Sequence, residues 1–219
     1  MVDEFAETEK GTLESFRKAF QGDPNRILDI NGLSLIESAV LSLRKGHDEG
    51  LDIARFLLLE GADPNLRDRG RFHRTPLACF YYNVWRPTPG QLTEVTRMML
   101  AAGADPNARD DRGGSCLSYL LMNVRLDDSQ IAPALDMLLA AGADPLQRGR
   151  WGQTPLALAD TAPWRQASAR RMEAELARQG RLGEDPGVGL PDESGSFRPY
   201  RGGDRVLGQD EPSPVNQKR

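Results

Sequence analysis

Apolar residues recur along this chain at helical spacing, and the runs that they form stop at glycines. Three apolar runs end just before Gly61, Gly103 and Gly142: Phe56–Leu59, Met98–Leu100 and Met137–Leu139. Glycine readily adopts the left-handed conformation that terminates a helix. The pattern therefore predicts three apolar helices, each capped by a glycine.

Two more segments carry apolar residues on one side of a helix. Residues 12–21 place Leu13, Phe16 and Phe20 on one face, which predicts a capping helix at the N-terminal end. Residues 164–180 place Met172 and Leu176 among charged residues. A polar outer face is what the last helix of a stacked array needs for solubility, so this segment predicts the C-terminal cap.

A four-residue motif, Gly-Ala-Asp-Pro, repeats at even intervals, and a shorter copy precedes it. The aspartates of the copies are spaced 40, 42 and 39 residues apart: Asp23, Asp63, Asp105 and Asp144. Ten to twelve residues after each aspartate stands a hydroxyl residue: Ser34, Thr75, Ser115 and Thr154. A hydroxyl caps a helix N-terminus, and the proline that follows two of them fits the first helical turn. Each unit is therefore predicted to contain a turn, a short capped helix, a loop and an apolar helix that ends at a glycine.

These units resemble the ankyrin repeat in the Thr-Pro-Leu helix start and the Gly-Ala-Asp-Pro-Asn exit. The resemblance covers about residues 10–180 and implies an all-α ankyrin-repeat solenoid of stacked helix-turn-helix units with helical caps. We expect this domain over residues 1–180, with a capping helix at about 12–21 and repeats at about 23–62, 63–104, 105–143 and 144–180.

Two departures from the family pattern stand out. The histidine that usually follows Thr-Pro-Leu is replaced in every unit, by Glu37, Ala78, Ser118 and Ala157. The period also exceeds the usual length of about 33 residues. The added residues fall between the two helices of a pair, at 43–50, 83–91 and 123–130. Such loops either mark a face that varies for function or are simply tolerated, because loop closure costs little extra free energy with length.

The composition changes after Gly180. Residues 180–219 hold 8 glycines and 5 prolines and show no apolar periodicity, so we expect residues 181–219 to form a disordered tail. Two apolar islands interrupt it, Phe197–Tyr200 and Val206–Leu207. Either could be a short docking motif, although isolated apolar residues are common in such tails.

Charge and composition exclude several classes of protein. The net charge of −4 argues against a nucleic-acid binder, and the chain has no apolar run of about 18 residues that could span a membrane. The acidic N-terminus lacks the features of a signal peptide. Two cysteines in 219 residues cannot form a disulfide framework, so we expect a cytoplasmic protein.

Candidate catalytic chemistry is sparse. The two histidines, His47 and His73, lie far from any cysteine pair, and the spacing motifs of zinc sites are absent. Cys79 and Cys116 fall on the short helices, where we expect small buried side chains rather than nucleophiles. No lysine follows Gly113-Gly114 as a phosphate-binding loop requires. We therefore expect no catalytic residue, no metal site and no cofactor.

What remains is a candidate binding surface. Arginines stand four residues after three of the turn aspartates, and stacking would align them along one edge: Arg67, Arg109 and Arg148. Arg150 and Trp151 adjoin the last of them. A basic stripe on an acidic chain would favour an acidic partner surface, although hairpin tips are commonly charged because they are solvated. Tyr81, Tyr82 and Trp85 add aromatic side chains of the type that anchors interfaces, and we expect at least one of them to contact a partner while one or two could instead pack against the adjoining repeat.

The sequence thus predicts a non-enzymatic protein–protein interaction module that is monomeric when free. It presents a rigid concave repeat surface to a protein partner and binds neither nucleic acid nor membrane. One alternative is a dedicated inhibitor, such as an immunity protein that blocks a toxin or another enzyme. A second is an activity outside the repeats, against which the tail argues, because it lacks catalytic residues.

Overall fold

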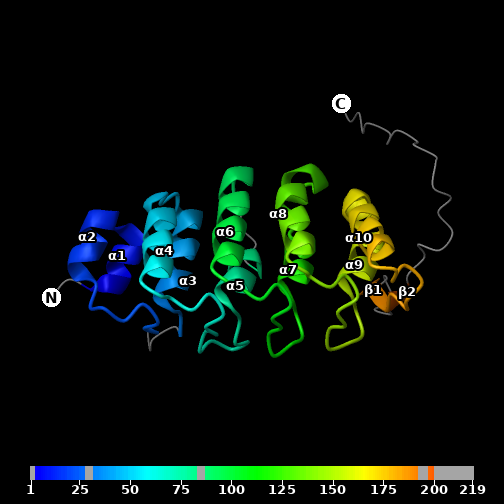
Figure 1. Cartoon of the computed structure of the whole chain (residues 1–219), viewed down its shortest axis with the longest axis horizontal. Coiled ribbons are helices and arrows are strands. Elements are labelled where there is room, and N and C mark those ends of the chain that lie inside the picture. The colour runs from blue at the N-terminus through cyan, green and yellow to red at the C-terminus, as the bar shows by residue number, and fades with distance from the viewer. Residues whose placement is uncertain (1–2, 28–31, 83–86, 192–196, 200–219) are drawn as a thin grey trace.

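The computed structural model covers the whole chain and describes residues 3–27, 32–82, 87–191 and 197–199. Pairs of antiparallel helices stand side by side in one row, which confirms the all-α solenoid (Figure 1). The short helices are α3 (Leu35–Ser42), α5 (Pro76–Tyr82), α7 (Cys116–Met122) and α9 (Pro155–Thr161). Their partners are α4 (Glu49–Leu59), α6 (Pro89–Ala101), α8 (Asp128–Ala140) and α10 (Gln166–Arg178).

The predicted capping residues start and stop these helices. Ser34, Ser115 and Thr154 each accept a hydrogen bond from a backbone N–H in the first turn. Gly61, Gly103 and Gly142 adopt φ values of 92°, 92° and 89°. A side chain would be strained in that left-handed conformation, so glycine is needed there.

The long helices begin earlier than the loop boundaries in the sequence suggested. Capping boxes at Thr88 with Gln91 and at Asp127 with Gln130 start α6 at Pro89 and α8 at Asp128. The loops predicted to reach Gln91 and Gln130 are therefore shorter. In the first unit a 3-10 turn, η1 (Leu43–Lys45), occupies part of the predicted loop.

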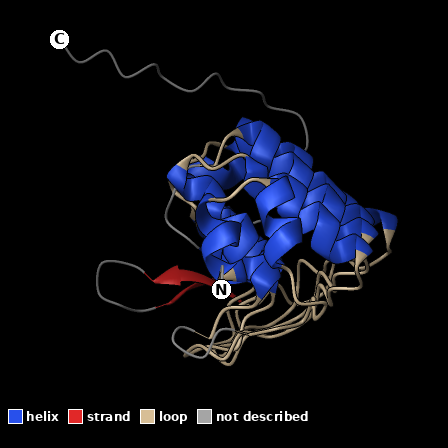
Figure 2. Cartoon of the chain, turned by 90° about the vertical axis from the view of Figure 1, so that its left-hand side faces the viewer, coloured by secondary structure: helices blue, strands red, loops and turns tan. Residues whose placement is uncertain are grey.

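Hydrogen bonds between successive turns hold the hairpins in register. The side chain of Asn65 accepts from the Asp105 N–H at 2.7 Å and donates to the Gly103 carbonyl at 2.9 Å. Asn107 makes the same two bonds to Asp144 and Gly142, both at 2.8 Å. The hairpins consequently gather on one side of the helices (Figure 2).

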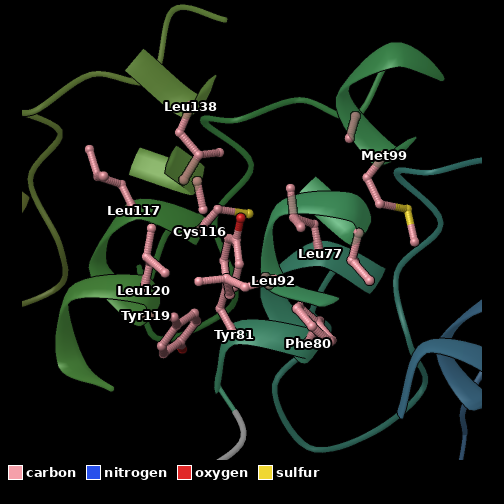
Figure 3. Packing of buried hydrophobic residues seen from close by; sticks show 14 of the residues in the cluster. Leu77, Phe80, Tyr81, Leu92, Met99, Cys116, Leu117, Tyr119, Leu120 and Leu138 are labelled. Carbon is pink, nitrogen blue, oxygen red and sulfur yellow. The ribbon is translucent and has the colours of Figure 1, made fainter. Parts of the chain in front are cut away.

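The core runs continuously through the row. Short helices contact short helices, and α6, α8 and α10 contact one another in sequence, so each unit covers apolar side chains of the next. Figure 3 shows this packing around Leu77, Tyr81 and Leu117. Cys79 and Cys116 are both buried, as predicted, and neither forms a disulfide bond.

The N-terminal cap is a helix pair rather than the single predicted helix. α2 (Leu13–Ala19) lies within the predicted segment, and α1 (Glu4–Lys10) precedes it and contacts α3. Glu4 is buried there, where it accepts from the Gln21 N–H and pairs with Arg26 at 2.6 Å. α1 was not predicted from the sequence, because this stretch is acidic and a buried glutamate is rare without a partner.

The predicted start of the tail at residue 181 needs correction. Strand β1 (Val188–Pro191) contacts α9 and pairs antiparallel with β2 (Phe197–Pro199). The preceding Asp185 accepts from the Gly187 N–H, which is the turn geometry of Asp63 and Asp105. The chain therefore continues the row of turns past residue 180. The rest of the predicted tail, including Tyr200 and Val206–Leu207, lies outside the described residues.

Candidate partner-binding surface

The three predicted ladder arginines all lie exposed on the hairpins, but they differ in their contacts. Arg67 donates to the His73 carbonyl of its own hairpin at 3.1 Å. Arg148 pairs with Asp185 of the C-terminal segment at 2.5 Å. Arg109 has no ion pair or side-chain hydrogen bond within the described residues. It is the member of the row whose charge is most available to a partner.

A cluster of arginines and aromatic rings lies between the second hairpin and the short helices. The Arg74 guanidinium carbon stands 3.4 Å from the centre of the Tyr82 ring, 4.6 Å from Phe72 and 5.5 Å from Tyr119. Arg112 covers Phe72 at 4.0 Å. We call Phe72, Arg74, Tyr82, Arg112 and Tyr119 the arginine–aromatic cluster.

The buried carboxylate of Asp110 holds two members of this cluster, Tyr119 and Arg74, in place. Its carboxylate accepts the Tyr119 hydroxyl and the backbone N–H groups of Arg112 and Gly114, the latter two at 2.9 Å. The same carboxylate lies 3.4 Å from Arg74 Nε. Desolvation raises the pKa of Tyr119 to about 12, so its hydroxyl stays a donor at neutral pH. Burial and these contacts give the cluster one defined arrangement.

The aromatic residues predicted as anchors divide into separate groups. Tyr81 is buried, and its hydroxyl shares a hydrogen bond with Thr96 of α6, so it belongs to the core (Figure 3). At 3% exposed, Tyr81 offers a partner almost no surface, so we place it in the core and leave it out of the proposed interface. Tyr82 is 44% exposed and packs edge-on against Tyr119, with ring centres 5.1 Å apart. Trp85 lies outside the described residues.

Arg150 and Trp151 form a second exposed site on the last hairpin. Trp151 is 62% exposed, and the Arg150 guanidinium lies 5.0 Å from its ring centre. Both residues lie in the turn of this hairpin. Exposed aromatic and arginine side chains are the types that most often dominate interface energetics.

Two members of the arginine–aromatic cluster, Phe72 and Tyr119, were not predicted from the sequence. A usable signal existed for Tyr119, which stands four residues after the cap Ser115, while Tyr82 stands seven after Thr75. Positions four and seven share one helix face, so the two rings could have been predicted to meet across adjacent units. Phe72 had no such signal, because its hairpin carries no periodic pattern.

The thiols of this region are poor nucleophiles. Burial raises the pKa of both Cys79 and Cys116 to about 12, which keeps them protonated at neutral pH. A catalytic cysteine requires the opposite shift. None of the helices in the described ranges is long and apolar enough to cross a bilayer.

Comparison with known proteins agrees with this architecture. Residues 31–69 match the ankyrin repeat family, a span that contains α3, α4 and the turn after them. No curated protein matches the chain. The match covers one unit of the row, and the other units follow it in helix order and turn geometry.

Proposed function

We propose that this chain, whose residues 31–69 match the ankyrin repeat family, binds a protein partner through its hairpin tips and the arginine–aromatic cluster, without catalysing a reaction. Ankyrin repeats are generally protein–protein interaction modules, and the stacked units form an extended binding surface. The observation that carries the proposal is that exposed Arg109 shares a hairpin with Arg112, which belongs to a cluster whose rings and guanidinium groups are already packed.

Preorganisation supports this use of the surface. A partner that docks on mobile side chains loses affinity, because each immobilised long side chain costs about 0.5–1.5 kcal/mol. Arg74 is already held between rings, and Tyr119 is held by Asp110. Both side chains are buried and contact the exposed Tyr82 ring, so little side-chain entropy remains to be lost when a partner covers that ring.

The charge of the surface favours an acidic partner. The second hairpin exposes Arg67, Arg69 and Arg71, while its Asp68 is buried. Arg109 and Arg112 continue this charge on the third hairpin, and Arg148 and Arg150 on the fourth. Charges at the rim of an interface accelerate encounter with a partner of opposite sign and make it salt-dependent.

Binding kinetics test the proposal once a pull-down from the source cell has identified a partner. Arg109→Glu should lower the association rate severalfold at low salt and reduce its salt dependence, since rim charges act on encounter. Tyr82→Ala should raise the dissociation rate about tenfold, because a packed aromatic ring acts after encounter.

Two variants of the outer layer serve as matched controls. Arg170→Glu reverses an exposed arginine on α10, and Leu59→Ala removes an apolar side chain that is 81% exposed at the end of α4. Both should leave association and dissociation unchanged. If the controls weaken binding as much as Arg109→Glu and Tyr82→Ala, the interface lies on the long helices and the proposal is wrong.

The finer assignments belong to the same proposal. We expect a monomer when free and a cytoplasmic location, which suits two buried cysteines that form no disulfide bond. Inhibition is distinguished from simple adaptor binding by adding the purified chain to an enzymatic partner. Loss of that partner's activity at stoichiometric concentration would identify an inhibitor.

A further inference from the structure

Three buried side chains with metal-ligating atoms meet between the first two units of the row. Glu37 lies on α3, Asp68 on the second hairpin and Cys79 on α5, and one ligand atom from each lies within 4.8 Å of the others. Their exposed fractions are 0%, 6% and 6%. The three residues are spread over more than forty positions of sequence, so only the fold brings them together.

Both carboxylates are oriented by the backbone. Glu37 Oε2 accepts from the Ser34 N–H at 2.8 Å and from its hydroxyl at 3.0 Å. Asp68 Oδ1 accepts from the Gly70 N–H at 3.0 Å. Outer hydrogen bonds of this type hold ligating side chains in place at metal sites. Each carboxylate thus keeps its second oxygen for another contact.

One of those oxygens is left unsatisfied by the protein. Glu37 Oε1 is fully buried and has no hydrogen-bond partner among the described residues. A buried polar atom without a hydrogen-bond partner destabilises the folded state. In the equivalent position the other units carry Ala78, Ser118 and Ala157, which avoid this cost.

We propose that Glu37, Asp68 and Cys79 bind a divalent cation of the zinc class and so join the second hairpin to α3. A thiolate with two carboxylate oxygens suits zinc, whereas magnesium and calcium prefer oxygen ligands alone. Three protein ligands leave the fourth tetrahedral position to water. The ion would satisfy Glu37 Oε1 and link two consecutive units.

Binding at this site must displace protons. Burial raises the pKa of Glu37 to about 8, with Asp68 adding to the shift, and burial raises that of Cys79 to about 12. Both groups are therefore mainly protonated at neutral pH, and metal ligands must be deprotonated. We expect protons to be released when the ion binds, and tighter binding as the pH rises.

Titration of the full-length chain with Co²⁺ tests the site, with the protein purified without a polyhistidine tag. We expect one ion per chain, a thiolate-to-cobalt absorption band in the near ultraviolet, and loss of the band when Zn²⁺ is added. Calorimetry in buffers of different ionisation enthalpy measures the proton release.

The chain offers a matched control, because its other cysteine is also buried on a short helix. Cys79→Ser should abolish the thiolate band, whereas Cys116→Ser should keep it, since Cys116 is not part of the cluster. Glu37→Gln and Asp68→Asn should lower zinc affinity at least tenfold. Circular dichroism of each variant establishes that it is folded.

Several outcomes would overturn the proposal. The first is a parent protein that binds no Co²⁺ or Zn²⁺ at micromolar concentration. The second is a thiolate band that survives in Cys79→Ser or that disappears equally in Cys116→Ser. The third is unchanged zinc affinity in Glu37→Gln. Any of these results would mean that Glu37, Asp68 and Cys79 are buried side chains of the core and do not bind a metal ion. Partner binding rests on the hairpins and is tested separately by Arg109→Glu.

Discussion

The two ends of the solenoid are closed in different ways. At the N-terminal end the rings of Phe16, Phe20 and Phe56 pack against one another, with Phe16–Phe56 and Phe20–Phe56 centres 6.0 and 5.5 Å apart. At the C-terminal end, the segment after α10 is held by polar contacts. Arg181 pairs with Asp144 at 3.1 Å, and Arg148 pairs with Asp185.

Leu146 accounts for part of this difference. In the first three turns an asparagine, Asn25, Asn65 or Asn107, accepts from the backbone of the following turn. The fourth turn has Leu146 in that position, so it has no side-chain amide to extend the row. The C-terminal segment is held instead by the ion pairs of Arg148 and Arg181 and by the contacts of β1 with α9. Apolar burial stabilises more than exposed ion pairs do, so we expect the N-terminal end to contribute more stability.

The largest expected effect is a pH dependence confined to the N-terminal half. Burial raises the pKa of Glu37 from 4.5 to about 8, so the folded state keeps a proton that the unfolded chain releases. The stability linked to this proton is complete below pH 4.5, falls as the pH rises towards 8 and then levels off. At about 1.4 kcal/mol per unit of pKa, the total is about 5 kcal/mol. The last unit has Ala157 in this position and no such dependence.

Urea unfolding between pH 4.5 and 8, with a chelator present to remove metal ions, measures this effect. Glu37→Gln should reduce the change in the free energy of unfolding between pH 4.5 and 8, because glutamine does not titrate. A parent protein and a variant with parallel pH profiles would show that Glu37 ionises normally in the folded chain.

A second test removes a ring from each end. Phe16 is fully buried, and Phe16→Ala should destabilise the chain by about 3–5 kcal/mol. Trp164 in η2 (Pro163–Arg165) is 48% exposed, and Trp164→Ala should cost under about 1 kcal/mol. Denaturant midpoints of the two variants give the comparison, and equal losses would remove the distinction between the ends.

A third test concerns the bridges that the C-terminal turn lacks. Asn107→Ala deletes two hydrogen bonds between turns and should cost about 1–3 kcal/mol, since each contributes about 0.5–1.5 kcal/mol. Hydrogen exchange should rise at the Asp144 amide, which loses its acceptor. An unchanged urea midpoint would mean that solvent replaces the bridge without loss.

The smallest effect is expected at Arg148. Its pair with Asp185 is exposed to solvent, so Arg148→Ala should leave the urea midpoint unchanged. Exchange of the backbone amides in residues 184–191 should nevertheless become faster, because the contact that holds this segment is lost. If exchange there stays slow, the contacts of β1 with α9 suffice to hold the segment.

Local signals in the sequence identified much of the fold. Ser34, Ser115 and Thr154 begin helices, and Gly61, Gly103 and Gly142 end them, because capping depends on residues only a few positions apart. A fifth turn could also have been predicted from the sequence. Asp185 follows Asp144 by 41 residues, which keeps the period, but the glycine-rich composition around it concealed the turn.

The repeat period, the cap positions and the row of hairpin arginines were determined by the sequence alone, since each depends on spacing along the chain. Tertiary structure decided which side chains meet. Tyr81 and Tyr82 are neighbours in sequence, yet one is buried against α6 and the other faces Arg74, because successive residues point in different directions from a helix. Glu37, Asp68 and Cys79 likewise meet only because two units stack, and no local pattern encodes that contact.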